Sequence, residues 1–257
     1  MISNLKDKNI IITGASEGLG KLIAIELSKV VSKIILVSSS EKKLKLLLNK
    51  CYNKKKHLVC PIDFNDINNV SLKLSQCVKH FDSIDAVLHI AGGGFGVKEY
   101  APSRDDYMKV FNINLFSIFE INRIIIPIMK KKKKGVLFHV GSIASNESVG
   151  SLSYNIAKSS ISTYVRSLSK PLAKYNICVS GISPGGFIYS KNSMNRLKTN
   201  NNKAYNQFIA KRLPLKRMPK AEELLPIIKV IIENHMMFTG SMISCDAGEG
   251  NFYKEFY

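Results

Sequence analysis

Seven short runs of apolar, mostly β-branched residues recur along the chain, and longer segments with a different spacing separate them. The runs occupy residues 9–13, 33–37, 58–62, 86–90, 136–140, 177–182 and 242–244. Continuous apolar runs of this length are typical of strands that are buried on both faces of a parallel sheet. We therefore predict seven parallel strands.

The segments between the runs place apolar residues at i, i+3 and i+4, the spacing of a helix with one buried face. They occupy residues 19–30, 41–51, 67–81, 105–129, 154–175 and 221–232. Strands that alternate with helices fold into a doubly wound parallel sheet with helices on both faces, which is an α/β fold. The chain has no internal repeat and no linker rich in Gly, Ser or Pro, so we expect residues 1–257 to form a single domain.

Residues 187–203 depart from this pattern. They are polar and rich in Asn, they follow Pro184-Gly185-Gly186, and a weaker helical segment at 204–212 comes after them. In open α/β sheets ligands bind beyond the carboxyl ends of the strands, where an insert after the sixth strand would stand. We therefore predict a mobile substrate lid around residues 187–212, with a loose surface loop as the alternative.

The composition, 45% hydrophobic and 22% charged over 257 residues, fits a folded globular domain and excludes a disordered or collagen-like chain. The 38 Lys and Arg residues against 19 Asp and Glu leave a net charge of +19. Such an excess can serve a nucleic acid, an anionic membrane, or an acidic substrate or carrier protein. Lys, Asn and Ile are abundant along the whole chain, however, so a general compositional bias is the favoured explanation.

The spacing of Cys and His suggests neither a metal site nor paired cysteines. The five cysteines lie far apart without a CxxC pair, and the five histidines follow no zinc-binding spacing. We therefore expect no metal and no disulfide. Residues 1–8 lack an apolar signal core, and Arg123 or Pro127 interrupts the apolar stretch at 121–129, which predicts a cytoplasmic protein without a membrane segment.

A glycine-rich turn follows the first predicted strand and precedes the first predicted helix. It reads Gly14-Ala15-Ser16-Glu17-Gly18-Leu19-Gly20. Gly14 permits a tight turn, Gly18 lets the backbone approach a pyrophosphate, and Gly20 lets the helix pack closely on the strand. Because amides at a helix N-terminus attract phosphate, this junction predicts a dinucleotide-binding site.

Two further strand ends carry residues that suit the same ligand. Asp63 follows the third strand and can accept a hydrogen bond from an adenine amino group, although a lone Asp there can equally cap the next turn. The fourth strand leads into Ala91-Gly92-Gly93-Gly94, small residues that let a ribose lie against the backbone.

Three polar residues suggest proton chemistry. Tyr154 and Lys158 are four residues apart on a predicted helix, which places the phenol and the ammonium on one face. The pKa of an ordinary tyrosine is about 10, and a nearby cation lowers it toward a value useful at neutral pH. Ser142 follows the preceding strand. These three residues are the candidate catalytic set.

Taken together, these motifs resemble the short-chain dehydrogenase/reductase family in its form of about 250 residues, over nearly the whole chain. The matching segments are Thr13 to Gly20, Asp63, Ala91-Gly92, Asn114 in Asn112-Ile113-Asn114-Leu115, Ser142 in Gly141-Ser142-Ile143-Ala144-Ser145, Tyr154 with Lys158, Pro184-Gly185, and Thr239-Gly240 leading to Asp246-Ala247-Gly248. The resemblance implies a Rossmann-type fold and hydride transfer between NAD or NADP and a carbonyl or secondary alcohol.

The resemblance also implies a role for each matching residue. Tyr154 would be the general acid/base, Lys158 would bind the nicotinamide ribose and lower the Tyr154 pKa, and Ser142 would hydrogen-bond the substrate oxygen. Asn114 would hold a water that relays protons, and Pro184-Gly185 would line the nicotinamide. The positions implied to contact the cofactor are Gly14, Ser16, Gly18, Leu19, Gly20, Ser39, Asp63, Ala91, Gly92, Tyr154, Lys158, Pro184 and Gly185.

Three positions depart from the family pattern. Ile90 replaces a second Asn, and Asp246-Ala247-Gly248 replaces the commoner Asp-Gly-Gly. The usual Thr after Pro184-Gly185 is missing, and Ser190 or Ser193 is a candidate to replace it in binding the carboxamide.

The end of the second strand bears on the choice of cofactor. No acidic residue stands near Ser39, where one would bind a ribose 2′-hydroxyl and repel a 2′-phosphate. Ser39 with Lys42 and Lys43 suits a phosphate, whereas Glu17 stands where NADP-binding relatives often carry a base. We predict NADP in preference to NAD.

A 3-oxoacyl-carrier reductase is the default activity, and oxidoreduction of a sugar or another secondary metabolite is the rival, favoured by the glycine-rich loop 92–96 and the unusual lid. Four lid cations suggest an acidic substrate: Lys191, Arg196, Lys198 and Lys203.

The family implies a homotetramer held by the long helices and the C-terminal tail. A nucleic-acid binder on this fold is the alternative of another class, supported by charge alone, and we expect no nucleic-acid partner.

Overall fold

A seven-stranded parallel sheet in the order β3-β2-β1-β4-β5-β6-β7 forms the centre of the molecule. The computed structural model describes residues 5–97, 99–233 and 236–250. The strands are β1 (Asn9–Thr13), β2 (Lys33–Ser38), β3 (Leu58–Pro61), β4 (Ala86–His89), β5 (Gly135–Val140), β6 (Ile177–Pro184) and β7 (Met242–Cys245). The predicted doubly wound α/β fold is confirmed, and the strand order reverses between β1 and β4, the place where ligands bind in such sheets.

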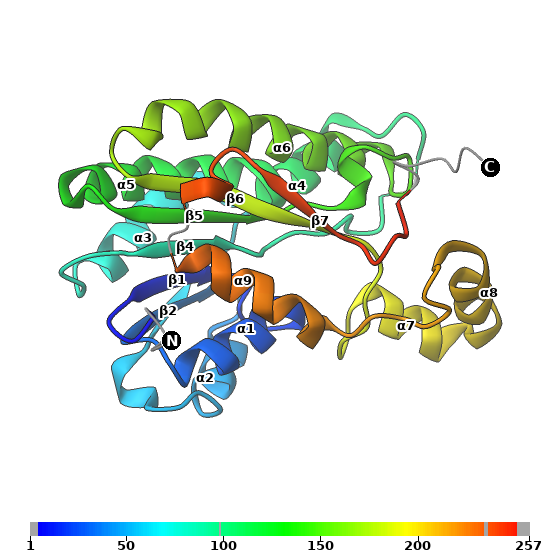
Figure 1. The fold of residues 1–257 in the computed structure, drawn as a ribbon, viewed down its shortest axis with the longest axis horizontal. Coiled ribbons are helices and arrows are strands. Elements are labelled where there is room, and N and C mark those ends of the chain that lie inside the picture. Colours follow the sequence, from blue (N-terminus) through cyan, green and yellow to red (C-terminus); the bar gives the residue numbers. More distant parts are fainter. Residues whose placement is uncertain (1–4, 98, 234–235, 251–257) are drawn as a thin grey trace.

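Helices cover both faces of the sheet (Figure 1). They are α1 (Gly18–Ser28), α2 (Glu41–Leu48), α3 (Ile67–Val78), α4 (Arg104–Phe111), α5 (Ser117–Lys132), α6 (Leu152–Ala173), α7 (Ser193–Asn200), α8 (Asn202–Arg212) and α9 (Leu225–Ile232). Side chains of α1, α2 and α9 pack with one face of the sheet, and those of α3, α5 and α6 pack with the other.

The alternation of side chains along each strand divides the core into these two layers. In β1, Ile10 and Ile12 join the layer of α1 and α9, whereas Ile11 joins the layer of α3 and α5. All three are fully buried. Each such side chain stabilises the fold by roughly 1.5–3 kcal/mol, and two-sided burial explains why the runs show no polar alternation.

The helix predicted over 105–129 is not continuous. A π-helical turn, Asn112–Phe116, separates α4 from α5. The Asn114 side chain, which is fully buried in this turn, donates to the Val110 carbonyl at 2.8 Å and to the Gly93 carbonyl at 2.9 Å. Periodicity cannot show such a wide turn, which is often found at functional sites.

The stretch Arg104–Lys132 is long and apolar enough to cross a membrane by length and composition. Its buried side chains include Ile118, Ile121 and Ile125, which pack in the layer that it shares with α3 and α6. Core packing therefore accounts for much of its apolar character.

In the segment predicted as a polar lid, the helical stretch expected at 204–212 is found as α8, and a helix that was not expected, α7, precedes it. Residues 193–200 and 202–212 form α7 and α8, which project beyond the carboxyl ends of the strands (Figure 1). Asn192 and Asn201 accept hydrogen bonds from the amides of Asn195 and Ala204, both at 2.9 Å. The Asn residues that suggested a loop thus cap helices, as Asn commonly does.

The expectation of no disulfide is wrong for one pair. The structure joins Cys60 in β3 to Cys77 in α3, with Cα atoms 6.3 Å apart. The two residues are 17 positions apart and share no short motif, because a strand–helix packing contact brings them together. Among the described residues Cys51, Cys178 and Cys245 form no disulfide.

Candidate active site

The turn between β1 and α1 has the shape predicted from its glycines. Gly14 and Gly18 adopt φ values of +64° and +55°, in the left-handed region that favours glycine. A Cβ atom on Gly20 would lie 2.3 Å from the Gly14 carbonyl oxygen, so only glycine fits there. A Cβ atom on Gly18 would meet no neighbour within 4 Å, which leaves this side of the turn open to a ligand.

The N-terminus of α1 is open to an anion. Glu17 occupies its N-cap position, but the side chain makes no capping hydrogen bond, and the first turn contains no acidic residue. The first amides of a helix lack partners within the helix. Those of Gly18, Leu19 and Gly20 are therefore available to a phosphate beside the glycine turn and Ser16.

A threonine links this turn to the loop after β4. The Thr13 hydroxyl accepts hydrogen bonds from the amides of Ile90 and Ala91, at 3.0 and 3.2 Å. A Cβ atom on Gly14 would lie 2.8 Å from the Ala91 Cα atom, so the two loops are in close contact. Thr13 is not among the site residues predicted from the sequence. Its position at the end of β1, directly before the glycine turn, could have indicated this role.

Asn114 fixes the same loop from the other side. Its Oδ1 accepts from the Gly93 amide at 3.1 Å, while its amide group donates to the Gly93 and Val110 carbonyls. A Cβ atom on Gly92 would lie 2.7 Å from Asn114 Oδ1 and 3.2 Å from Lys158 Nζ. Glycine at this position therefore lets Asn114 and Lys158 approach one another.

Ser142, Tyr154 and Lys158 come together beyond the end of β5. The Ser142 hydroxyl contacts the Tyr154 phenol. Lys158 Nζ lies 5.5 Å from the centre of the Tyr154 ring and donates to the Val140 carbonyl at 2.8 Å. The structure thus places the three predicted catalytic side chains in one group, beside the loop that Asn114 holds.

The predicted fall in the Tyr154 pKa is not found in this structure. Burial raises the pKa of Tyr154 above the ordinary value, and the hydrogen bond with Ser142 only partly opposes the rise. Burial also lowers the pKa of Lys158 to about 8. The helical spacing predicted the proximity of the two groups correctly, but it could not show that burial disfavours both charged forms.

The residues predicted at the adenosine end are exposed. Ser39 lies at the end of β2, and Asp63 follows β3. Asp63 Oδ1 accepts from the backbone and side-chain amides of Asn65, at 2.9 and 3.1 Å, so it caps its own turn. Nearby, Glu17 forms an ion pair of 2.8 Å with Lys43, which lowers the Glu17 pKa.

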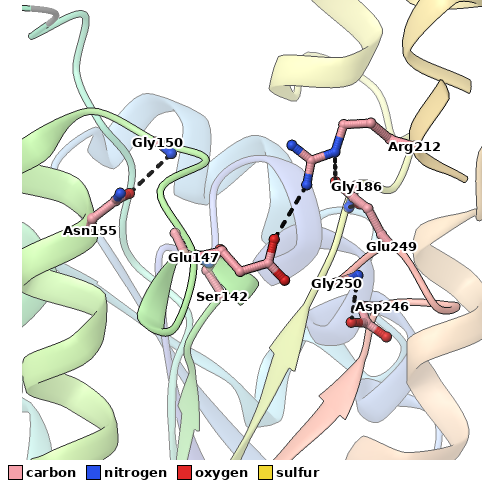
Figure 2. Close-up of polar contacts among 10 residues, drawn as sticks. Ser142, Glu147, Gly150, Asn155, Gly186, Arg212, Asp246, Glu249 and Gly250 are labelled. Atoms are coloured by element: carbon pink, nitrogen blue, oxygen red, sulfur yellow. Dashed lines mark hydrogen bonds and ion pairs between the residues drawn. The ribbon is translucent and has the colours of Figure 1, made fainter. Parts of the chain in front are cut away.

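Pro184 ends β6, and the turn that follows it meets a cluster of charged residues (Figure 2). The Gly186 amide donates to the Glu249 carboxylate. Arg212, the last residue of α8, lies 3.6 Å from both Glu249 and Glu147, the latter in the loop after Ser142. No motif or spacing in the sequence points to these three charged residues.

No group of three or more His, Cys, Asp or Glu side chains in the described part of the chain is arranged to hold a metal ion.

The sequence profile of a family described as "short chain dehydrogenase" matches residues 8–201, more than half of the chain. The protein is a short-chain dehydrogenase. Its family membership makes it an oxidoreductase that acts on CH–OH or carbonyl groups with a nicotinamide cofactor.

Curated relatives of this short-chain dehydrogenase agree with the assignment. It is 30% identical over 243 residues to the 3-oxoacyl-acyl-carrier-protein reductase of Buchnera aphidicola, covering 94% of this chain and 96% of that protein. It is also 30% identical over 189 residues to the NADP-dependent 3-hydroxy acid dehydrogenase of Schizosaccharomyces pombe, covering 72% and 73% of the two chains.

Solved structures share the fold of this short-chain dehydrogenase. L-sorbose reductase from Gluconobacter frateurii, complexed with NADPH and L-sorbose, superposes with a TM-score of 0.87 at 21% identity, covering 98% of this chain and all of that one. Levodione reductase gives a TM-score of 0.86 at 21% identity, covering 97% and 100%.

The residues of this short-chain dehydrogenase fit the nicotinamide dinucleotide that its family uses. The open side of Gly18 and the uncapped α1 amides suit a pyrophosphate. Gly92 removes the side chain that would otherwise separate a ribose from Lys158. The glycine turn, which we call the dinucleotide cradle, follows β1, and the group of Ser142, Tyr154 and Lys158 lies beyond the end of β5. Because β1, β4 and β5 are adjacent strands, one extended ligand can reach both.

Proposed function

We propose that this short-chain dehydrogenase is an NADP-dependent reductase of a carrier-bound 3-oxoacyl group, with Tyr154 as its general acid. The observation that carries the proposal is the contact of the Tyr154 phenol with Ser142 and its proximity to Lys158, beside the dinucleotide cradle. Phenol, hydroxyl and ammonium together can supply a proton and stabilise the negative charge that develops on a carbonyl oxygen.

When bound, the nicotinamide dinucleotide would supply the hydride that reduces the carbonyl carbon. Ser142 donates a hydrogen bond to the carbonyl oxygen, and Tyr154 delivers its phenolic proton to the same oxygen, which yields the alcohol and a phenolate. Lys158 would stabilise that phenolate and would hold the nicotinamide ribose. Asn114, whose Oδ1 retains a second acceptor lone pair, holds a water that returns a proton from solvent.

The raised pKa of Tyr154 keeps the phenol in the form that donates a proton during reduction. A phenol with a pKa above the ordinary tyrosine value is almost fully protonated near pH 7, so it is ready to donate. Oxidation of the alcohol needs the phenolate as a base, and that form becomes abundant only in alkaline solution.

NADP is the proposed cofactor because the adenosine end offers cations and no carboxylate at the end of β2. Ser39 is exposed there, and Lys42 and Lys43 lie in the first turn of α2. Glu17 opposes a 2′-phosphate, but its ion pair with Lys43 offsets its charge. The relative from Schizosaccharomyces pombe is NADP-dependent by name, which supports the same choice.

The proposed substrate class rests on the relatives that align along almost the entire chain. The 3-oxoacyl-acyl-carrier-protein reductases of Buchnera aphidicola are 30% identical over 94–95% of this chain. The lid cations Lys191, Arg196 and Lys198 suit an acidic carrier protein. We propose that residues 187–212 close over the site when such a substrate binds.

Steady-state turnover of NADPH and NADH with a substrate panel tests this proposal. The panel holds a 3-oxoacyl thioester on acyl carrier protein, its pantetheine analogue, and several keto sugars. We expect oxidation of NADPH with the carrier thioester and a lower KM than with the analogue. Turnover of a keto sugar without turnover of either thioester would support the rival sugar reductase instead.

A homotetramer is the proposed assembly. An open depression of about 610 Å³ lies on α5 and α6 among Phe119, Ile156 and Tyr164, and Ile156 is 40% exposed. Apolar helix faces of this kind suit a contact between subunits. The C-terminal tail, predicted as a further contact, lies outside the described residues. Light scattering after size-exclusion chromatography is expected to give four times the mass of the chain.

We keep a cytoplasmic location as a proposal, although the Cys60–Cys77 pairing removes the cysteine pattern as an argument for it. A reducing compartment predicts that both thiols are reduced in the cell. Alkylation during lysis, followed by mass spectrometry, measures this: full alkylation of Cys60 and Cys77 supports the proposal, and protection of both contradicts it.

A further inference from the structure

Glu249 is a buried carboxylate that the proposed chemistry does not use. Its side chain is 3% exposed. Burying a carboxylate is costly unless charged or hydrogen-bonding partners compensate for lost water. Burial raises the pKa of Glu249, while the hydrogen bond from Gly186 and the charge of Arg212 oppose the rise; Asp246 and Glu147 are the other charged groups that face it.

The partners of Glu249 belong to the turn after β6. Its Oε2 accepts the hydrogen bond from the Gly186 amide. A Cβ atom on Gly185 would lie 2.6 Å from the same oxygen, and one on Gly186 would lie 3.2 Å from it. The carboxylate thus packs directly against the Gly185-Gly186 peptide, and the two glycines make this approach feasible.

One face of α8 completes the enclosure of this turn. Phe208 would lie 3.3 Å from a Cβ atom on Gly186, and Arg212, four residues later on the same face, lies 3.6 Å from Glu249 Oε1. The Arg212 guanidinium also sits near the Phe208 ring, 5.9 Å from its centre. The amino group Nη2 of Arg212 is buried without a hydrogen bond and faces Glu147 at 3.6 Å.

Arg212 therefore joins three segments that are distant in sequence, as Figure 2 shows: the lid helix α8, the loop after Ser142, and the turn that carries Glu249. Through Glu249 it also reaches the turn after Pro184. The link from α8 to the turn after β6 therefore runs through two contacts, the Arg212–Glu249 ion pair and the Glu249–Gly186 hydrogen bond.

We infer that Glu249, anchored by Arg212, is a positioning residue for the nicotinamide half of the cofactor, because it fixes the Gly185-Gly186 peptide. This inference rests on the proposed function, in which Pro184-Gly185 lines the nicotinamide. Loss of the carboxylate leaves the Gly186 amide without its acceptor and frees the peptide to rotate. The adenosine half, which lies at β1 and β2, is unaffected.

The test compares two ligands on the purified full-length chain. One is NADPH, and the other is 2′-phospho-ADP-ribose, which has the adenosine half and both phosphates but no nicotinamide. If the wild type prefers NADH, NADH and ADP-ribose replace them. Titration calorimetry gives both dissociation constants, and the emission of bound NADPH reports on the surroundings of its nicotinamide.

For Glu249→Ala we expect the NADPH dissociation constant to rise about tenfold, the usual size for an orphaned buried donor. The constant for the fragment is expected to stay within a factor of two, and the emission of bound NADPH to approach that of free NADPH. Glu249→Gln, which keeps an acceptor for Gly186, is expected to recover most of the affinity. Arg212→Ala is expected to resemble Glu249→Ala.

Arg217→Ala is the matched control, since Arg217 pairs with Glu223 at 2.7 Å on the exposed surface; neither ligand is expected to bind differently. Equal weakening of NADPH and the fragment in Glu249→Ala and Glu249→Gln would assign Glu249 a purely structural role and overturn the inference. Unchanged binding of both ligands would overturn it too. A wild type that binds neither ligand would instead contradict the proposed function on which the inference rests.

Discussion

The ammonium nitrogen of Lys158 lies 5.5 Å from the centre of the Tyr154 ring, and it is almost fully buried. It donates a hydrogen bond to the Val140 carbonyl at 2.8 Å, so the last residue of β5 holds the cation near the phenol. The buried ammonium lowers the free energy of unfolding of the protein, and it places a positive charge beside the catalytic phenol. Both effects can be measured.

The stability of the cofactor-free protein is expected to carry the pH signature of Lys158. Burial lowers its pKa to about 8. Between pH 8 and the ordinary lysine value the unfolded chain binds more protons here than the folded chain, so this group makes the free energy of unfolding rise with pH. Below pH 8 the charged form costs about 3 kcal/mol relative to an exposed lysine.

Lys158→Met removes this titration while keeping most of the side-chain volume. Urea unfolding at pH 7 and pH 10 is expected to show a smaller rise in the free energy of unfolding with pH in the variant than in the wild type. An identical pH dependence in both proteins would show that Lys158 titrates normally.

Ser142→Ala is expected to lower kcat for carbonyl reduction by about 10²–10³, the usual effect of losing one donor to a developing oxyanion. The NADPH dissociation constant is expected to stay the same, because Ser142 contacts Tyr154 and not the glycine turn. Pre-steady-state kinetics separate the two quantities. A variant with weaker NADPH binding and normal kcat would assign Ser142 to the cofactor instead.

The ion pair between Glu17 and Lys43 is expected to limit NADP binding. Glu17→Gln removes a negative charge from the adenosine end and frees Lys43, so NADPH is expected to bind several-fold more tightly while NADH changes little. Lys43→Ala is expected to weaken NADPH selectively. Fluorescence titration at low and high salt checks both, and equal effects on the two cofactors would argue against a 2′-phosphate site here.

Gly20→Ala is expected to disrupt the β1–α1 junction. Its Cβ atom would lie 2.3 Å from the Gly14 carbonyl oxygen, a backbone atom that cannot rotate away. Overpacking of this kind costs about 1–3 kcal/mol, so the midpoint of thermal unfolding is expected to fall and dinucleotide binding to weaken. Gly96→Ala is the control, because a Cβ atom there meets nothing within 4 Å although its φ of +81° adds strain; it is expected to leave dinucleotide binding intact.

The parts of this molecule that local sequence determines could be predicted. All seven strands could be predicted from their short apolar runs, which two-sided burial explains in the inner strands, as at Ile10 to Ile12. Tyr154 and Lys158 were predicted because one helical turn separates them. The fold of the glycine turn followed from Gly14, Gly18 and Gly20, whose conformations and contacts leave little choice.

The parts that depend on distant contacts could not be predicted. The contact of Arg212 with Glu147 and Glu249 joins residues from three separate segments, and no spacing connects them. The pairing of Cys60 with Cys77 needs the packing of α3 against β3. The Tyr154 pKa depends on burial, which the i, i+4 spacing does not report.

The central claim is that Tyr154 is the general acid. The rate of hydride transfer from NADPH to a carbonyl substrate in the Tyr154→Phe variant tests it most directly. The variant keeps the ring beside Lys158 and removes only the proton donor, so we expect NADPH to bind within a factor of two of the wild-type affinity. Single-turnover oxidation of that bound NADPH by a carbonyl substrate is expected to slow by at least about 10²-fold. A wild-type single-turnover rate in the variant would contradict Tyr154 as the general acid.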